Sequence, residues 1–340
     1  MKNEERKIFW ETLCSLDGSN PEQDAEKLRK TIKYPRFLYR YRPVNTKNLE
    51  ALQTNRLYFS SANYYDDPFD TFLHIDIDRV ERELKSSFSN PETLGRLAEY
   101  SRTFSSKHPN FFPQEFVKMF SDPQGIQKVF FGGLGASFLD YLLTLRNKVR
   151  EDTWSVCFSE NGLNETLWMK YADQYKGFSV IYDLDKPENF LCGTQEKCQS
   201  CFFQKVHPML YPLYYSDMPY DATDFSKTVL LHTAIKETNL PDMQEIFAKA
   251  EPVYWERERT TLIKKKCHHY DEEWRMITWG DVKPPVMLEW IPYGVVLGLG
   301  MSKDDRESVI SIAKQVGIEH VFESFINRKN QLDAHPVKLN

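Results

Sequence analysis

The sequence lacks the features that mark several classes of protein. Its 44 Lys and Arg residues are outnumbered by 49 Asp and Glu residues, which gives a formal net charge of -5. An acidic balance excludes a generic binder of polyanions, although it is compatible with a local basic face. The six cysteines are few and unevenly spaced. This spacing excludes the disulfide framework of a small secreted protein, so we expect reduced thiols.

Long apolar runs are also absent. The most apolar stretch, Phe130–Leu145, is interrupted by Asp140 and falls short of the ~18 uninterrupted apolar residues that a membrane span requires. The first residues, Met1 to Lys7, are polar and show no apolar core of a secretion signal. We therefore expect a buried helix at 130–145 and a cytoplasmic protein.

No familiar catalytic motif is present. The sequence contains no Walker A loop, no GxGxxG, no HExxH and no GxSxG, which are the usual marks of phosphate binding, dinucleotide binding, zinc proteolysis and acyl transfer. Aromatic residues, in contrast, make up 14% of the chain. This content excludes disorder for most of the chain, and 340 residues bury enough surface to fold without metals or disulfides.

Strand-like patterns gather in three clusters, at 37–60, 153–183 and 253–299, with helical patterns between them. This order predicts an α+β fold with non-local strand pairing and helical insertions, and not a regular βαβ series. The predicted organisation is an N-terminal helical segment at 1–31, one α+β domain at 32–327 and a polar tail at 328–340. Within the α+β domain we expect a helical insertion at 79–149 and an irregular to helical insertion at 186–250.

Two arginines share one face of the first predicted strand. Arg40 and Arg42 alternate there with Tyr39 and Tyr41. Two guanidinium forks on one strand face suit a phosphate or a carboxylate. A solvated basic face is the simpler interpretation.

Acidic residues follow the second predicted strand in NYYDDPFD, residues 63–70. Asp66, Asp67 and Asp70 offer the hard oxygen ligands that a divalent cation prefers. We favour a structural turn instead, in which Pro68 fixes the backbone, Phe69 points inward and the carboxylates cap nearby amides.

Three further groupings contain chemically useful side chains. Asp271 and Glu273 would share one strand face, which is costly unless they are exposed, functional or neutralised by Arg275. Trp168 and Tyr171 are three residues apart on one predicted helix, where they either line a pocket for a flat ring or fill the core. A tetrahedral zinc site is a less favoured possibility than a metal-free insert, and its ligands would be Cys192, Cys198, Cys201 and His207.

Four ordered blocks carry a resemblance to a known family. They are FLYRYRP with RLYFSSANYYDDPFD, VCFSE with TLWMKYADQYKGFSVIYD, YDEEWRMI, and VVLGLGMS. Together they resemble the bacterial domain-of-unknown-function family twenty-nine seventy-one over residues 37–72, 153–183 and 268–302. Some members of that family are described as abortive-infection proteins, so the resemblance implies a role in phage defence.

The basic strand, the following NLEAL helix and a strand that ends in serine are also similar to the start of DarT-like DNA ADP-ribosyltransferases. That resemblance implies an ADP-ribosyltransferase-like core, which is a split, mostly antiparallel β-sheet with helical insertions, and it implies NAD as a substrate. Arg40 or Arg42 would bind the pyrophosphate, Ser159 would position the nicotinamide ribose, and Glu273 would stabilise the oxocarbenium-like ribose. The sequence has Asp271 where the family has Glu or Gln. The aromatic side chains expected at the cofactor are Tyr39, Trp168 and Tyr171.

The leading hypothesis is an NAD-dependent ADP-ribosyltransferase-like protein that modifies a macromolecule, such as nucleic acid, in phage defence or toxicity. A metal-dependent nuclease is the first alternative, with the ligands Asp67, Asp70, Asp271 and Glu273. A non-catalytic module that senses or binds a nucleotide is the second. The sequence does not indicate an oligomeric state.

Overall fold

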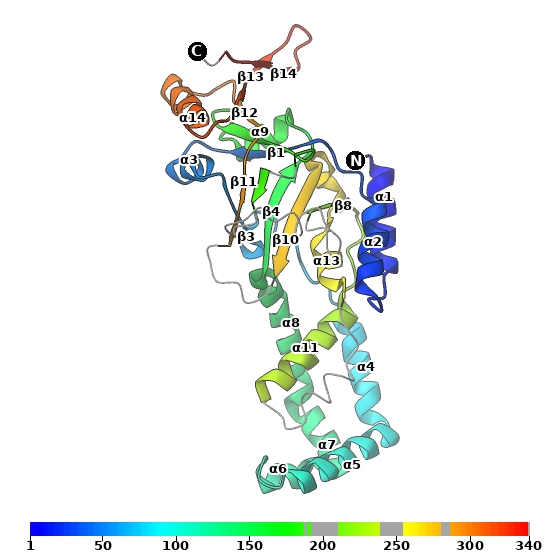
Figure 1. Cartoon of the computed structure of the whole chain (residues 1–340). Coiled ribbons are helices and arrows are strands. Elements are labelled where there is room, and N and C mark those ends of the chain that lie inside the picture. The colour runs from blue at the N-terminus through cyan, green and yellow to red at the C-terminus, as the bar shows by residue number, and fades with distance from the viewer. Residues whose placement is uncertain (187–188, 192–209, 239–253, 280–285, 339–340) are drawn as a thin grey trace. The chain divides into compact units, whose positions relative to one another are not determined.

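The computed structural model describes residues 1–186, 189–191, 210–238, 254–279 and 286–338 (Figure 1). The chain divides into two compact units. The first comprises Met1–Thr71, Arg150–Pro219 and Arg257–Asn340, and the second comprises Phe72–Val149 and Tyr220–Glu256.

A nine-stranded, mostly antiparallel sheet forms the centre of the first unit. Its order is β14–β13–β12–β5–β1–β4–β10–β7, and β3 pairs with β4. The strands are β1 (Phe37–Arg42), β3 (Ser60–Ser61), β4 (Thr153–Ser159), β5 (Phe178–Asp183), β7 (Leu210–Pro212), β10 (Glu273–Trp279), β12 (Gly294–Leu297), β13 (His320–Ile326) and β14 (Leu332–Pro336). The α+β class with a mostly antiparallel sheet is therefore confirmed.

Shorter strands and helices complete the first unit. The strands β2 (Arg56–Tyr58), β11 (Met287–Trp290) and β6 (Phe190–Leu191) form a small sheet, and β8 (Tyr214–Tyr215) pairs with β9 (Ile263–Lys264). The helices are α1 (Asn3–Ser15), α2 (Pro21–Thr31), α3 (Thr46–Gln53), α9 (Glu165–Tyr171), α13 (Glu256–Thr261) and α14 (Lys303–Gln315).

Three adjacent strands of the sheet, β1, β4 and β10, come from the three predicted clusters. β4 lies between β1 and β10 (Figure 1), and it pairs with β10 along its whole length, from Thr153 opposite Trp279 to Ser159 opposite Glu273. Segments more than a hundred residues apart in the chain thus become neighbours, because antiparallel pairing buries the apolar residues that alternate along each strand.

The N-terminal helices belong to the first unit. Asn20 caps α2 by accepting a hydrogen bond from the backbone N–H of Gln23, as its sequence predicts. In α1 the buried Arg6 donates to the backbone carbonyls of Leu213 and Glu273, at 2.8 and 2.9 Å. The segment predicted as a separate stretch at 1–31 therefore helps to fix the start of β10.

The second unit consists of helices among its described residues. They are α4 (Ile77–Ser89), α5 (Pro91–Lys107), α6 (Gln114–Phe120), α7 (Pro123–Val129), a π-helical turn (Phe130–Leu134), α8 (Gly135–Asp152) and α11 (Thr223–Thr238). Leu73, Val80, Leu142 and Phe225 are members of its main hydrophobic cluster. The helical pattern predicted at 79–149 is thus confirmed, but it forms this second unit together with residues 220–256.

The apolar stretch around 130–145 is more exposed than the sequence suggested. Within the described ranges, one helical stretch, Pro123–Asp152, has the length and mean hydropathy of a candidate membrane span, and 22% of its apolar window is buried. Core helices of water-soluble proteins pass the same test. The expected fully buried helix is wrong, because only one stripe, including Leu142 and Leu145, faces the core.

The C-terminal segment also differs from the expectation. The polar tail predicted at 328–340 contains β14, which pairs with β13 from Phe322 opposite Pro336 to Ile326 opposite Leu332. β14 is only five residues long and contains Asp333 and Pro336, residue types that are rare in strands, so its sequence does not stand out as a strand. The insertion predicted at 186–250 is divided between the two units.

Candidate functional site

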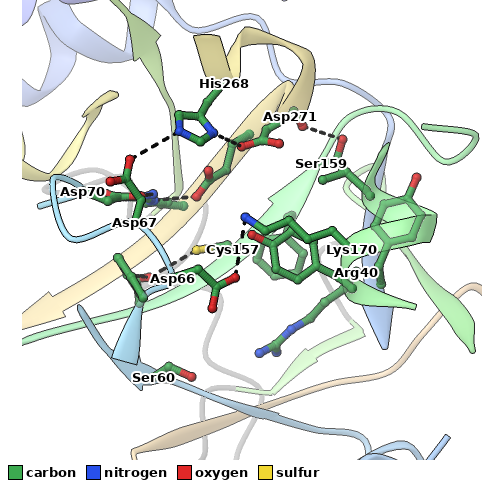
Figure 2. Close-up of a pocket in the computed structure, with 18 of the residues that line it drawn as sticks. Arg40, Ser60, Asp66, Asp67, Asp70, Cys157, Ser159, Lys170, His268 and Asp271 are labelled. Atoms are coloured by element: carbon green, nitrogen blue, oxygen red, sulfur yellow. Dashed lines mark hydrogen bonds and ion pairs between the residues drawn. The ribbon is translucent and has the colours of Figure 1, made fainter. Parts of the chain in front are cut away.

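A cavity of about 310 Å³ lies beside β1, β4 and β10 in the first unit. Figure 2 shows how side chains from these strands and from the acidic loop turn toward it. Most of the residues selected from the sequence line this one cavity: Tyr39, Arg40, Arg42, Ser159, Tyr171, Asp271 and Glu273.

Strand register explains how three of them come together. Ser159, the last residue of β4, lies opposite Tyr39 of β1 on one side and opposite Glu273 of β10 on the other. Backbone pairing fixes these positions to within one residue, because a slip by one would turn each side chain to the other face of the sheet. The same row of the sheet therefore presents a phenol, a hydroxyl and a carboxylate.

Five charged side chains form a buried network at one end of the cavity. Arg275 forms a two-pronged ion pair with Asp70, at 2.6 and 2.7 Å, and its Nε lies 2.6 Å from a Glu273 oxygen. Lys264 lies 2.9 Å from the other Glu273 oxygen and 2.8 Å from Asp271. Two cations thus face three carboxylates, and each carboxylate has a charged partner.

These partners shift the ionisation of the network. Burial alone would raise the pKa of Glu273, but Arg275 and Lys264 outweigh it and hold that pKa far below its ordinary range. Burial also opposes the charge on Lys264, yet Glu273 and Asp70 raise its pKa well above the usual value. Asp271 behaves differently, because burial raises its pKa more than Lys264 lowers it. Glu273 is therefore ionised at neutral pH.

Asp271 and Glu273 do not share a strand face as predicted. β10 begins at Glu273, Asp271 ends a short 3-10 segment (Lys266–Asp271), and Glu272 between them has φ of 45°. The left-handed residue breaks the strand alternation. The two carboxylates meet instead at the ammonium group of Lys264.

Ser159 is buried and its hydroxyl is already engaged. Its Oγ donates to the backbone carbonyl of Asp271 at 2.8 Å and accepts from the N–H of Asn161 at 3.1 Å. These bonds join the end of β4 to the turn that precedes β10. The side chain contributes an oriented oxygen at the cavity wall.

Arg40 and Arg42 form the opposite end of the cavity. Nη2 of Arg40 donates to the Tyr58 carbonyl at 3.1 Å, while its buried Nε has no hydrogen-bond partner. Within the described part of the chain, neither arginine forms an ion pair with a carboxylate. Burial and the neighbouring Arg40 lower the pKa of Arg42 to about 9. Among the described residues, no acidic group forms an ion pair that offsets the positive charge of this end.

Trp168 does not line the cavity, which corrects its assignment as a cofactor contact. It is fully buried, its ring meets Tyr41 edge to face at 5.3 Å, and its Nε1 donates to the Gly162 carbonyl. The inner face of α9 packs on β1, so Trp168 fills the core. Tyr171, three residues on, lies at the edge of that face and is 36% exposed at the cavity.

The acidic loop only partly follows the structural turn that we favoured. Oδ1 of Asp67 accepts from the backbone N–H of Phe69 at 2.8 Å, as an Asx turn requires. Phe69 is 50% exposed, so its predicted inward position is wrong; the ammonium of Lys265 lies over its ring instead, at 3.7 Å. Asp70 caps no amide, because Arg275 holds both of its oxygens.

Sequence reasoning did not place two functional groups at this cavity. Lys264 stands in a run of three lysines, a pattern typical of an exposed basic surface, but the short pair β9 and β8 buries it. His268 lies between two carboxylates, 3.3 Å from Asp67 and 4.0 Å from Asp271 (Figure 2). Its position depends on the 3-10 segment, and no local sequence pattern predicts that segment.

Neither metal hypothesis gains direct support. The zinc ligands considered from the sequence, Cys192, Cys198, Cys201 and His207, lie outside the described residues. Among the residues that the structure does describe, no group of three or more His, Cys, Asp or Glu side chains is arranged to hold a metal ion.

Comparison with protein-family models, with curated proteins and with solved structures finds no match for this chain. The function must therefore be argued from the cavity itself.

Proposed function

We propose that this chain is an NAD-dependent ADP-ribosyltransferase-like enzyme that transfers ADP-ribose to a macromolecule. The observation that supports the proposal most is the single register row that holds Ser159 between Tyr39 and Glu273, with Arg40 and Arg42 on the same cavity. The arginine, serine and glutamate that the resemblance names come from three neighbouring strands. Chance packing seldom brings such residues to one cavity.

The charges suit the two ends of a dinucleotide. The pyrophosphate of NAD would bind the uncompensated Arg40 and Arg42, since guanidinium groups form paired hydrogen bonds with phosphate oxygens. The nicotinamide ribose would then reach toward Ser159 and Glu273. Tyr171, exposed at the cavity wall, offers a ring face on which nicotinamide can stack.

The proposed chemistry breaks one glycosidic bond and forms another. The bond between the nicotinamide nitrogen and ribose C1′ breaks, and its electron pair leaves with neutral nicotinamide. The cationic ribose that develops is stabilised by the ionised Glu273 carboxylate. A nucleophile on the target then bonds to C1′ and loses its proton. His268, which faces Asp67 and Asp271, is placed to accept that proton.

The nuclease alternative has less support from the geometry. A catalytic Mg²⁺ needs carboxylate oxygens that are available as ligands. Both oxygens of Asp70 accept from Arg275, and both oxygens of Glu273 face cations. Direct coordination of a metal would require breaking these buried pairs, whereas electrostatic stabilisation of a nearby ribosyl cation would not, because the network has three carboxylates and two cations.

Release of nicotinamide from NAD by the purified protein tests the proposal. The assay would include EDTA in one arm and, as acceptors, single-stranded DNA, double-stranded DNA and a protein extract. We expect nicotinamide release that is insensitive to EDTA and labelled ADP-ribose on one acceptor. Cleavage of nucleic acid that EDTA abolishes would favour the nuclease. NAD binding with no release, across all acceptors, would favour the non-catalytic module.

A further inference from the structure

A second cavity, of about 170 Å³, adjoins the first. The two share Arg40, Arg42 and Ser60 in their walls. Figure 2 shows Arg40 on the side of Ser60, away from His268 and Asp271. The arginine pair thus lies between the acidic network and a second space.

The second cavity is lined by positive charge. Lys47 and Arg56 join Arg40 and Arg42 in its wall, and no Asp or Glu is among the described residues that line it. Glu289 lies near one of these cations: its Oε1 is 3.8 Å from Nε of Arg56, beyond hydrogen-bond distance. Four cations around so small a volume repel one another unless an anion offsets them.

Buried donors in this wall are left unsatisfied. Nε of Arg40 and Nε of Arg56 are both inaccessible to solvent and have no hydrogen-bond partner. Arg40 itself is only 9% exposed. A buried donor without an acceptor costs stability, and an ion bound at the site is one explanation for keeping it.

Polar amides and apolar carbons complete the wall. Asn45 and Asn48, at the start of α3, supply amide groups to the wall of the cavity. Leu52, Val180 and Tyr182 supply its apolar carbons. Fixed guanidinium forks backed by an apolar floor favour a compact, multiply charged oxyanion over a hydrated halide ion. Phosphate, with several acceptor oxygens, fits that description best.

We infer that the second cavity is a phosphate-binding site in which Lys47 and Arg56 act together with the arginine pair. The ligand is the phosphate group of a nucleotide. It is either the pyrophosphate of the dinucleotide or an additional phosphate on its adenosine ribose. The inference depends on the proposed function only for this choice between sources, since phosphate binding requires no turnover.

Calorimetric titration with inorganic pyrophosphate tests the site. We expect the wild-type protein to bind with a Kd below about 1 mM. Lys47→Gln should weaken binding by roughly 3–10-fold, as loss of one charge-assisted contact does. Lys47 is exposed at the rim, so this variant keeps its fold. Arg56→Gln should act in the same direction, with its melting temperature recorded alongside.

Lys303→Gln is the matched control, because it removes one exposed lysine from the start of another helix, α14. It should leave pyrophosphate binding unchanged. Equal weakening by Lys303→Gln and Lys47→Gln would reduce the effect to net charge and overturn the site. Absence of wild-type binding up to about 10 mM would overturn it too.

Two further titrations identify the source of the phosphate. If the site holds an additional ribose phosphate, NADP binds more tightly than NAD, and Lys47→Gln removes the difference. If it holds the pyrophosphate, both dinucleotides bind alike and Lys47→Gln weakens both. Lys47→Gln binding NAD and NADP as the wild type does would contradict the inference. Glu273→Gln separates it from the proposed function, since that variant should lose turnover and keep pyrophosphate binding.

Discussion

Buried charge is handled differently at the two ends of the main cavity. At one end Arg275 and Lys264 satisfy Asp70, Asp271 and Glu273 at 2.6–2.9 Å. At the other end Arg40 and Arg42 have no carboxylate partner among the described residues. The first arrangement is complete without a ligand and holds Glu273 in one orientation. The second gains its electrostatic partner only when an anion binds.

The comparison predicts different costs for removing an arginine at each end. Arg275→Met leaves Asp70 without its two-pronged partner and Glu273 with Lys264 alone. We expect a loss of about 3–5 kcal/mol in the free energy of unfolding, because a buried charge loses its counterion. Urea denaturation measures it. Arg306→Met is the control: its pair with Glu323 is one-third exposed and contributes about 0–1 kcal/mol. Similar losses in both variants would show that the network is not specially stabilising.

Low pH should selectively weaken the buried ion-pair network at the first end of the cavity. Arg275 and Lys264 lower the pKa of Glu273 in the folded protein, so its contribution to stability is present above the unfolded value, near 4.5, and is lost as pH falls below it. Asp271 contributes to the pH dependence in the opposite direction. Because burial raises its pKa, its protonation at falling pH favours the folded state. Between pH 6 and 3 the wild type should lose on the order of 1–3 kcal/mol through Glu273. Glu273→Gln should flatten this part of the pH profile; an identical slope would remove Glu273 from the account.

At the second end, Arg42→Gln should affect binding and not stability. The variant removes a cation that has no acidic partner, so the melting temperature should stay the same or rise slightly. Affinity for NAD should fall by about tenfold, which corresponds to ~1.4 kcal/mol. Calorimetry and thermal unfolding on one preparation measure both. A marked loss of stability with unchanged affinity would make Arg42 a structural residue.

Much of this comparison could be predicted from the sequence, and part of it could not. Period-two alternation located β1, β4 and β10, and it placed Arg40 and Arg42 on one face. Antiparallel pairing then brought Ser159 to Glu273. Lys264 could not be placed, because burial of a lysine in a basic run depends on tertiary contacts across the short pair β8 and β9.

Two errors have a common cause. Trp168 and Tyr171 lie on one helix face, yet the face is narrow and only its edge reaches the cavity. β14 is short and ends in Pro336, so its sequence does not predict a strand, and it forms by pairing with β13. A local sequence pattern predicts the type of element and which residues share a face. The burial of each side chain depends instead on the tertiary contacts that cover it.

The smallest expected effect concerns the aromatic wall. Tyr171→Leu keeps apolar volume but removes the ring at the cavity edge. If nicotinamide stacks there, affinity for NAD should fall by about 3–10-fold, in line with ~0.5–1.5 kcal/mol for an aromatic pair. Stability should change little, since the side chain is 36% exposed. Tyr100→Leu, at a 57% exposed tyrosine in α5 of the other unit, is the control and should bind NAD as the wild type does.

The central claim is that the ionised Glu273 carboxylate stabilises a ribosyl cation formed from NAD. Nicotinamide release by wild type and by Glu273→Gln, with melting temperatures from the same preparations, tests it most directly. The account predicts a rate lower by roughly 10²–10³-fold with nearly unchanged NAD affinity, since a stabiliser of the transition state is lost. Wild-type turnover that persists undiminished in Glu273→Gln would contradict the claim and leave Glu273 as a structural partner of Arg275 and Lys264.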